Sequence, residues 1–189
     1  MSKQRRPSWV VASWVLLAGS AACSPANPAD GNWIGDEVTR NDFEAVAGWG
    51  GADRSTLTRD HAHSGRYAVV VDANHETGLT FDLPLYEASV HSLAAVEVDA
   101  WVYLPHDQAD ASLQVETVAE GPEPHAVLHS EQLPLLSAVA EFKKWTPVHH
   151  IFRLPGSPPN GTHVRLFLKR GSNPAPVYLD DIRVRAREW

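Results

Sequence analysis

The chain has 189 residues, of which 43% are hydrophobic, and its formal net charge at pH 7 is −7. This length is enough for one domain with a proper hydrophobic core. The acidic balance argues against nucleic acid as a partner and against a polybasic membrane-binding patch. The single cysteine excludes an intramolecular disulfide framework.

The N-terminus has the three-part order of an export signal. A basic start at residues 3–6, an apolar run at 9–18 and small residues at 19–22 precede Cys23. A signal peptide needs this order because a peptidase must bind extended backbone just after the apolar run. The run is well under the roughly 20 residues that a membrane-spanning helix needs. We therefore predict a signal peptide over residues 1–22.

The small residues directly before Cys23 resemble a bacterial lipobox, whose cysteine is lipidated and becomes the mature N-terminus. The resemblance implies a lipid-anchored protein of the bacterial cell envelope, and Ser24 in place of Asp implies sorting to the outer membrane. A plain secreted protein and export by the twin-arginine route are the alternatives. Cleavage leaves 167 residues and a formal charge of −10, because 13 Lys and Arg then face 23 Asp and Glu.

Residues 23–37 are predicted to be a flexible tether between the lipid and a folded domain. Pro, Ala, Gly, Asn and Asp dominate this segment, and it has no periodicity. The folded domain is expected over residues 38–187, without an internal repeat of solenoid length.

The rest of the chain alternates in the manner of half-buried strands. In the strongest run, 94–104, the even positions are apolar, and positions 97, 99, 101 and 103 are Glu, Asp, Trp and Tyr. Further strands are predicted at 67–71, 79–83, 113–118, 148–154, 164–169 and 177–184. One helix of a turn or two is expected within 132–144, where Pro134 limits it. Many strands with Pro- and Gly-rich connections predict an all-β fold of antiparallel sheets, a sandwich or a barrel.

Three segments in this order resemble a known family. They are Asn41-Asp42-Phe43-Glu44, the turn and strand from His63 to Val69, and the closing strand from Val177 to Val184. Together they resemble the galactose-binding-like β-jelly rolls, and among these the carbohydrate-binding modules of families four, nine and twenty-two. The resemblance covers about 150 residues. It implies an antiparallel β-sandwich of jelly-roll type that binds carbohydrate and is not an enzyme.

Such modules commonly hold one structural calcium ion. The resemblance points to Glu44 and Asp180 as its carboxylate ligands, with Asp181 as the substitute. Calcium takes six to eight oxygen ligands, and backbone carbonyls of the turn at 64–65 could complete the shell. The ion would join the N-terminal segment to the last strand. The alternative is that these carboxylates are solvated charges at strand ends.

Sugars are bound by aromatic rings that cover their C–H faces and by planar polar groups that meet their hydroxyls. If the valines of the 94–104 run face the core, the residues between them line the outer surface of a sheet, and adjacent strands could add others. The candidate ligand-binding residues are Glu97, Trp101, Tyr103, Gln114, Arg165, Phe167 and Trp49. The alternatives are that Trp101 lies under a loop, that Phe167 belongs to a second core layer and that Trp49 plugs the core.

Catalysis has weaker support in the sequence. The ten histidines show no zinc spacing, and no P-loop or nucleophile-elbow motif occurs. A glycosidase would need paired carboxylates, for which Glu97 and Glu116 are the candidates. The sequence therefore predicts a membrane-anchored lipoprotein that binds a polysaccharide or other glycan non-covalently. The alternative is a structural or adhesive envelope lipoprotein that binds protein partners and no glycan.

Overall fold

The computed structural model describes residues 33–50, 54–121 and 125–188. Cys23, the predicted signal peptide and most of the predicted tether lie outside the described residues. The described elements are β1 (Trp33–Asn41), β2 (Trp49–Gly50), a 3₁₀ turn (Arg54–Thr56), β3 (Leu57–Thr58), β4 (Ala68–Val71), β5 (Thr80–Pro84), α1 (Leu85–Ala88), β6 (Leu93–Tyr103), β7 (Ala111–Ala119), β8 (Val127–Pro134), α2 (Leu135–Ala138), β9 (Trp145–Arg153), β10 (Thr162–Arg170) and β11 (Val177–Glu188). Within the described ranges, no helix has the length and apolar character to cross a membrane.

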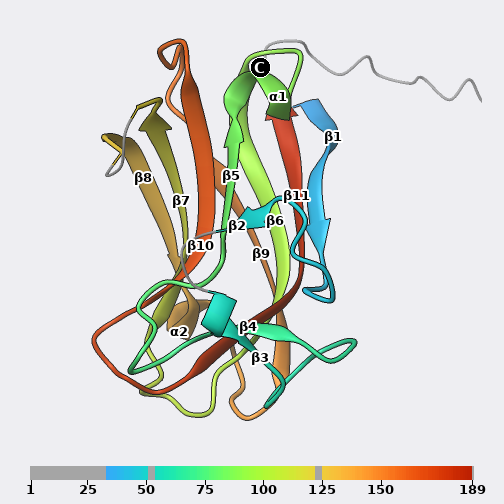
Figure 1. Ribbon diagram of the computed structural model, residues 1–189, viewed down its shortest axis with the longest axis vertical. Coiled ribbons are helices and arrows are strands. Elements are labelled where there is room, and N and C mark those ends of the chain that lie inside the picture. The colour runs from blue at the N-terminus through green and yellow to red at the C-terminus, as the bar shows by residue number, and fades with distance from the viewer. Residues whose placement is uncertain (1–32, 51–53, 122–124, 189) are drawn as a thin grey trace, which may run out of the picture. The chain divides into compact units, whose positions relative to one another are not determined.

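Two antiparallel sheets form the domain. In sheet A the strand order is β3-β4-β11-β6-β9, and β1 also pairs with β11; in sheet B the order is β2-β5-β10-β7-β8. Figure 1 shows β5, β10, β7 and β8 of sheet B side by side, with strands of sheet A in a second layer. This arrangement confirms the predicted all-β fold, an antiparallel β-sandwich of jelly-roll type.

The core lies between the two sheets and follows from the alternation in the sequence. Successive side chains of a strand point to opposite faces, so every second residue reaches the core. In β6 and β10 the inward, buried residues are Val96, Val98, Ala100, Val102, Val164, Leu166 and Leu168. Burying one such Val or Leu side chain contributes about 1.5–3 kcal/mol relative to leaving it exposed. The two inner faces therefore hold the sheets together.

Four strands were not predicted from the sequence: the two-residue strands β2 and β3, and the longer strands β1 and β8. The folded part begins with β1 at Trp33 and not at Val38, and β1 pairs with β11 through irregular register between Ile34 and Thr39. That irregularity breaks the period of two, which is why the alternation did not reveal the strand. β8 was missed because it is an edge strand whose residues are mostly exposed. The short helix expected after Pro134 is present as the single turn α2.

The two edge strands β8 and β9 contact each other through side chains. The Glu131 carboxylate of β8 accepts a hydrogen bond from the backbone N–H of Arg153 in β9 at 2.7 Å. His150 Nε2 of β9 lies 3.4 Å from the same carboxylate, and His129 Nε2 lies 3.1 Å from the Arg153 carbonyl oxygen. These contacts link sheet A to sheet B along one side of the sandwich.

Candidate functional site

The predicted ligand-binding residues lie on two different sheets. Glu97, Trp101 and Tyr103 are on the outer face of sheet A, in the alternation that the sequence indicates. The neighbours of β6 are β11 and β9, whereas β7 and β10 belong to sheet B. A single groove that combines these residues with Gln114, Arg165 and Phe167 is therefore wrong. For the same reason, Glu97 and Glu116 do not form the carboxylate pair of a glycosidase.

The two aromatic side chains of β6 are covered by histidine rings. His63 stacks on Trp101 with ring centroids 3.9 Å apart and an interplanar angle of 15°, and His61 stacks on Tyr103 at 4.5 Å and 18°. Trp145 of β9 lies against Tyr103 at 5.9 Å. A sugar would need the ring faces that the imidazoles occupy. The alternative in which Trp101 lies under a loop is confirmed, and this part of the face is a packed layer.

Glu97 belongs to a charge cluster of the same face. Its side chain is 5% exposed, and its carboxylate contacts Arg185 at 2.5 Å and Arg187 at 2.6 Å, both from β11. Arg185 also lies 2.7 Å from Asp99, which lies 2.8 Å from His149. A carboxylate held by two arginines cannot turn toward a sugar without breaking both ion pairs and leaving Arg187 without this partner. Glu97 thus joins β6 to β11.

Asp99 shows the balance of charges in this cluster. Burial acts to raise the pKa of Asp99, but the hydrogen bond from His149 and the charge of Arg185 outweigh it and hold the pKa below its usual value. A metal ion needs several His, Cys, Asp or Glu ligands close together. Among the described residues, Glu97, Asp99 and His149 are the one group of three or more such residues whose ligand atoms all lie within 4.8 Å of one another. Arg185 contacts both carboxylates and Arg187 contacts Glu97, so two positive charges balance the two negative ones and the group forms an ion-pair network.

The predicted metal ligands gather round the turn at residues 63–67. Glu44 accepts hydrogen bonds from the backbone N–H groups of Arg66 at 2.5 Å and Tyr67 at 2.9 Å. The hydrogen bond from the Arg66 N–H is the main cause that lowers the pKa of Glu44. Gly65, in the same turn, has φ +58°. A Cβ atom at this position would lie only 2.6 Å from Glu44 Oε1. Glu44 therefore joins the end of β1 to this turn.

The two aspartates contact the other side of the same turn from β11. Asp180 is fully buried and accepts the backbone N–H groups of His63 at 2.7 Å and Ser64 at 3.2 Å. Asp181 lies 2.5 Å from His63 Nδ1 and accepts the Ser64 hydroxyl at 2.8 Å. A bulge in β11, where Asp181 has φ +46°, points both carboxyl groups toward the turn.

The donor set at this turn suits calcium chemically. Burial raises the pKa of Asp180 to about 6, although the N–H groups of residues 64, 181 and 63 act against the shift. A divalent cation would compensate that buried carboxylate. Glu44 and Asp181 would have to move to supply further oxygens to the same ion, because the ligand atoms of the three residues do not all lie within 4.8 Å of one another. The same oxygens already accept hydrogen bonds from the turn, so the turn is fixed by the chain's own groups. The calcium ion stays a prediction.

The outer face of sheet B brings the other candidates together. Arg165 of β10 pairs in register with Glu116 of β7, and Phe167 pairs with Gln114. Gln114 Nε2 donates to Glu116 Oε1 and to Ser130 Oγ of β8, both at 2.9 Å. Phe167 is 6% exposed, so little of its ring is available to a ligand.

The polar layer continues onto β5. Asp82 lies 3.5 Å from Arg165 Nε and 2.7 Å from His163 Nδ1. We call the row Asp82, Arg165, Glu116, Gln114 and Ser130 the sheet B row. Asp82 and Ser130 were missed by the sequence analysis, because only the strand order β5-β10-β7-β8 shows that they extend it.

Trp49 was predicted either to bind a ligand or to plug the core, and the structure places it in the core. It is 3% exposed and packs between Phe43 at 5.4 Å and Phe81 at 5.6 Å. The ring fills the core beside β5 and is not available to a ligand.

Comparison with known proteins identifies solved structures of similar fold. No protein-family model and no curated protein matches the chain. The CBM22-2 xylan-binding domain of Paenibacillus barcinonensis Xyn10C is 14% identical, with 79% of this chain and 99% of that chain covered and a TM-score of 0.51. The chain has the fold of carbohydrate-binding modules.

Two further solved structures agree with this likeness. A xylan-binding domain from CBM 22 is 13% identical, with 79% of this chain and 94% of that chain covered and a TM-score of 0.51. The CBM22-1–GH10 modules of Clostridium thermocellum Xyn10B, complexed with xylohexaose, are 12% identical, with coverage of 80% and 28% and a TM-score of 0.51. The predicted resemblance to carbohydrate-binding modules is thereby confirmed for the fold.

Proposed function

We propose that the domain binds carbohydrate non-covalently, without catalysing a reaction, on the outer face of sheet B. The observation that carries the proposal is the sheet B row, in which four adjacent strands present carboxylate, guanidinium, amide and hydroxyl groups on one surface. Planar polar groups of this kind pair with the hydroxyls of a sugar. The row follows the direction across the strands, so an extended polysaccharide can contact several members at once.

The comparisons support the same class of ligand. Structures with this fold include two xylan-binding domains and one complex with xylohexaose. The contrasting state of sheet A also favours sheet B, because Trp101 and Tyr103 of β6 each have a histidine ring stacked on them. In the sheet B row, Asp82 and Ser130 are exposed and the other three members are partly exposed.

A pull-down on insoluble polysaccharides tests this function. The full chain is mixed with xylan, cellulose, mannan and galactan, and retention is compared with that of the Gln114→Ala and Arg165→Ala variants. The matched control is Arg153→Ala, which removes an exposed arginine of sheet A. We expect retention on at least one polysaccharide, its loss in the two sheet B variants and no change in the control. Absence of retention on the whole panel by a folded protein would favour a structural envelope protein with protein partners.

We also propose that a calcium ion binds at the turn held by Glu44, Asp180 and Asp181. The buried carboxyl group of Asp180 supports this site, because an ion would stabilise its charged form. At a free concentration 100 times its Kd, a ligand that binds only the folded state stabilises it by about 2.7 kcal/mol. The melting temperature should therefore be higher in calcium than in EDTA, and equal values would refute the site.

We further propose that Cys23 is lipidated and anchors the protein in the bacterial envelope, at the outer membrane. The residues before Cys23 and Ser24 after it support this proposal. The full chain should partition into the detergent phase of a bacterial extract, and Cys23→Ser should remain in the aqueous phase. Equal partition of the two proteins would refute the anchor.

A further inference from the structure

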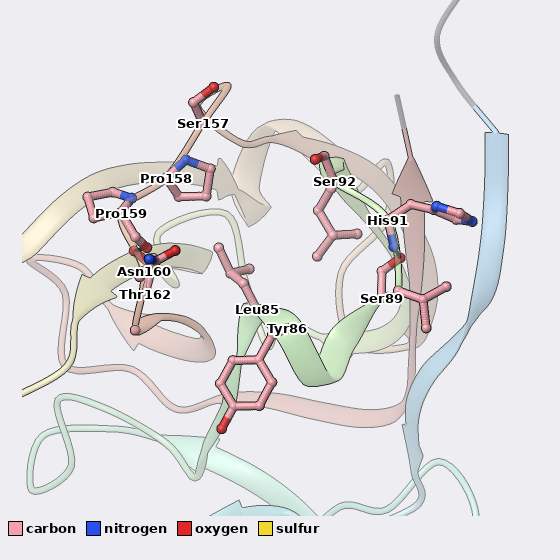
Figure 2. Close-up of a pocket in the computed structure, with 13 residues that line it drawn as sticks. Leu85, Tyr86, Ser89, His91, Ser92, Ser157, Pro158, Pro159, Asn160 and Thr162 are labelled. Atoms are coloured by element: carbon pink, nitrogen blue, oxygen red, sulfur yellow. Dashed lines mark hydrogen bonds between the residues drawn. The ribbon is translucent and has the colours of Figure 1, made fainter.

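A pocket of about 520 Å³ lies at one end of the sandwich, and no residue of the sheet B row lines it. Figure 2 shows its two sides. On one side lie α1 and the connection to β6, with Tyr86, Ser89 and Ser92; on the other lies the β9–β10 loop, with residues 157–160. Its volume falls within the roughly 300–1,000 Å³ of small-molecule sites.

Tyr86 leaves an aromatic ring uncovered at this pocket. Its side chain is 72% exposed, compared with 37% for Phe142, the other aromatic residue among the described large apolar side chains that are exposed. Val90, also in the lining, is 93% exposed. Trp101 and Tyr103, by contrast, each have a histidine ring stacked on one face. A bare ring beside a pocket is the platform on which the C–H face of a sugar stacks.

The loops that form the pocket are fixed before any ligand arrives. The Ser89 hydroxyl donates a hydrogen bond to Glu188 at the end of β11. In the opposite loop, Thr162 Oγ1 donates to the Pro159 carbonyl at 2.6 Å, and the Gly161 carbonyl accepts the backbone N–H of Glu120 at 2.9 Å. A preformed site reduces the conformational entropy that binding would otherwise cost.

The remaining polar groups of the lining are open to solvent and comprise His91 and three residues with uncharged side chains. Ser92, Ser157 and Asn160 are exposed, and each offers both a donor and an acceptor to a hydroxyl-rich ligand. The described lining contains no Lys, Arg, Asp or Glu. The apolar side chains of Leu85 and Leu93 complete it.

Two carboxylates lie close to Tyr86 outside the pocket. The charge of Glu87 is the main cause that raises the pKa of Tyr86, and Glu120 acts in the same direction. The Glu120 carboxylate lies next to Gly161 of the lining, since a Cβ atom on Gly161 would be 2.6 Å from Glu120 Oε2. An anionic sugar such as a uronic acid would be repelled by both carboxylates.

We propose that this pocket is a second saccharide site, in which a neutral sugar stacks on Tyr86 and its hydroxyls pair with Ser92, Ser157 and Asn160. The site goes beyond the proposed function because it uses no residue of the sheet B row and needs no binding there. A pocket at the end of the sandwich suits the end or a side branch of a glycan, whereas the sheet suits a continuous chain.

Isothermal titration of the full chain tests the second site. The probes are xylohexaose and cellohexaose, with a galacturonate hexamer as the anionic probe. The measurement is made in the Arg165→Ala background, so that the sheet B row contributes little. A neutral probe should still bind this variant; adding Tyr86→Ala should weaken binding about tenfold, and Tyr86→Phe should stay within about twofold.

The control is Phe142→Ala, which removes the other exposed aromatic side chain of the described residues and should leave the affinity unchanged. Because Tyr86 is exposed, its substitution should leave the melting temperature unchanged, so lost binding reports the site and not the fold. If Arg165→Ala alone abolishes binding, the second site is overturned and the sheet B function stands. Equal affinity with and without Tyr86, or tighter binding of galacturonate, also overturns the second site. Absence of binding of every probe by the wild type overturns both proposals.

Discussion

Glu97→Gln is the substitution that best separates a structural from a ligand-binding role on sheet A. The Glu97 side chain is 5% exposed and is the carboxylate partner of Arg187 at 2.6 Å. Removing one partner of a buried ion pair costs about 3–5 kcal/mol. We expect the lower value, about 3 kcal/mol, since Arg185 keeps Asp99 at 2.7 Å and the two arginines are 23% and 14% exposed.

In a domain of this size, each kcal/mol shifts the melting temperature by about 2–4 °C, so the predicted loss is about 6–12 °C. Differential scanning calorimetry of the wild type and the variant measures it. The matched control is Glu141→Gln, which breaks the pair with Lys144 at 2.5 Å, where the side chains are 60% and 54% exposed. That exposed pair should be worth less than about 1 kcal/mol. If Glu97→Gln melts within 1 °C (about 0.3–0.5 kcal/mol) of the wild type, the structural reading of the cluster is wrong. If it also loses polysaccharide retention, Glu97 is a ligand-binding residue after all.

Three further outcomes follow from the described contacts. Trp101→Ala should destabilise the domain by about 2 kcal/mol, below the roughly 3–5 kcal/mol of a fully buried Trp, because the ring is half-buried. Retention on polysaccharide should be unchanged. An unchanged melting temperature together with lost retention in the pull-down would instead support a ligand-binding groove on sheet A. Asp99 has a folded-state pKa below the ordinary value of 3.8 for this group, so it stabilises the fold above about pH 4, and this contribution is lost as the pH falls through the folded pKa. Melting temperatures from pH 7 to 3 should therefore fall less steeply for Asp99→Asn, and parallel curves would contradict this. Gly65→Ala should cost about 1–2 kcal/mol in urea unfolding, because φ is +58° and the new Cβ would meet Glu44, whereas an unchanged midpoint would show that the turn adapts.

The strands could largely be predicted because alternation is a local property of the sequence. The run at 94–104 correctly indicated that Val96 and Val98 face the core and that Glu97 faces outward. The choice of neighbouring strands depends on long-range pairing, which a period of two does not contain. That is why Gln114 was assigned to the same surface as Trp101 although it lies on the other sheet.

The candidate site shows the same limit at the level of single side chains. An outward Trp on a strand has the same periodicity whether solvent or a loop covers it, and the histidine above Trp101 is 38 positions earlier in the chain. Convergence of Glu44 and Asp180 on one turn followed from the family resemblance, not from spacing. Tyr86 was missed because a helix of four residues has no measurable period.

The contacts between β8 and β9 affect how the protein behaves among copies of itself. An edge strand normally leaves N–H and C=O groups free, and a strand of another molecule can pair with them. Here the N–H of Arg153 is bound by Glu131, and its carbonyl oxygen lies beside His129. Side chains thus occupy backbone groups that an incoming strand would need. The sandwich can therefore end in water on this side with less tendency to aggregate edge to edge, which matters for any protein kept at high local concentration.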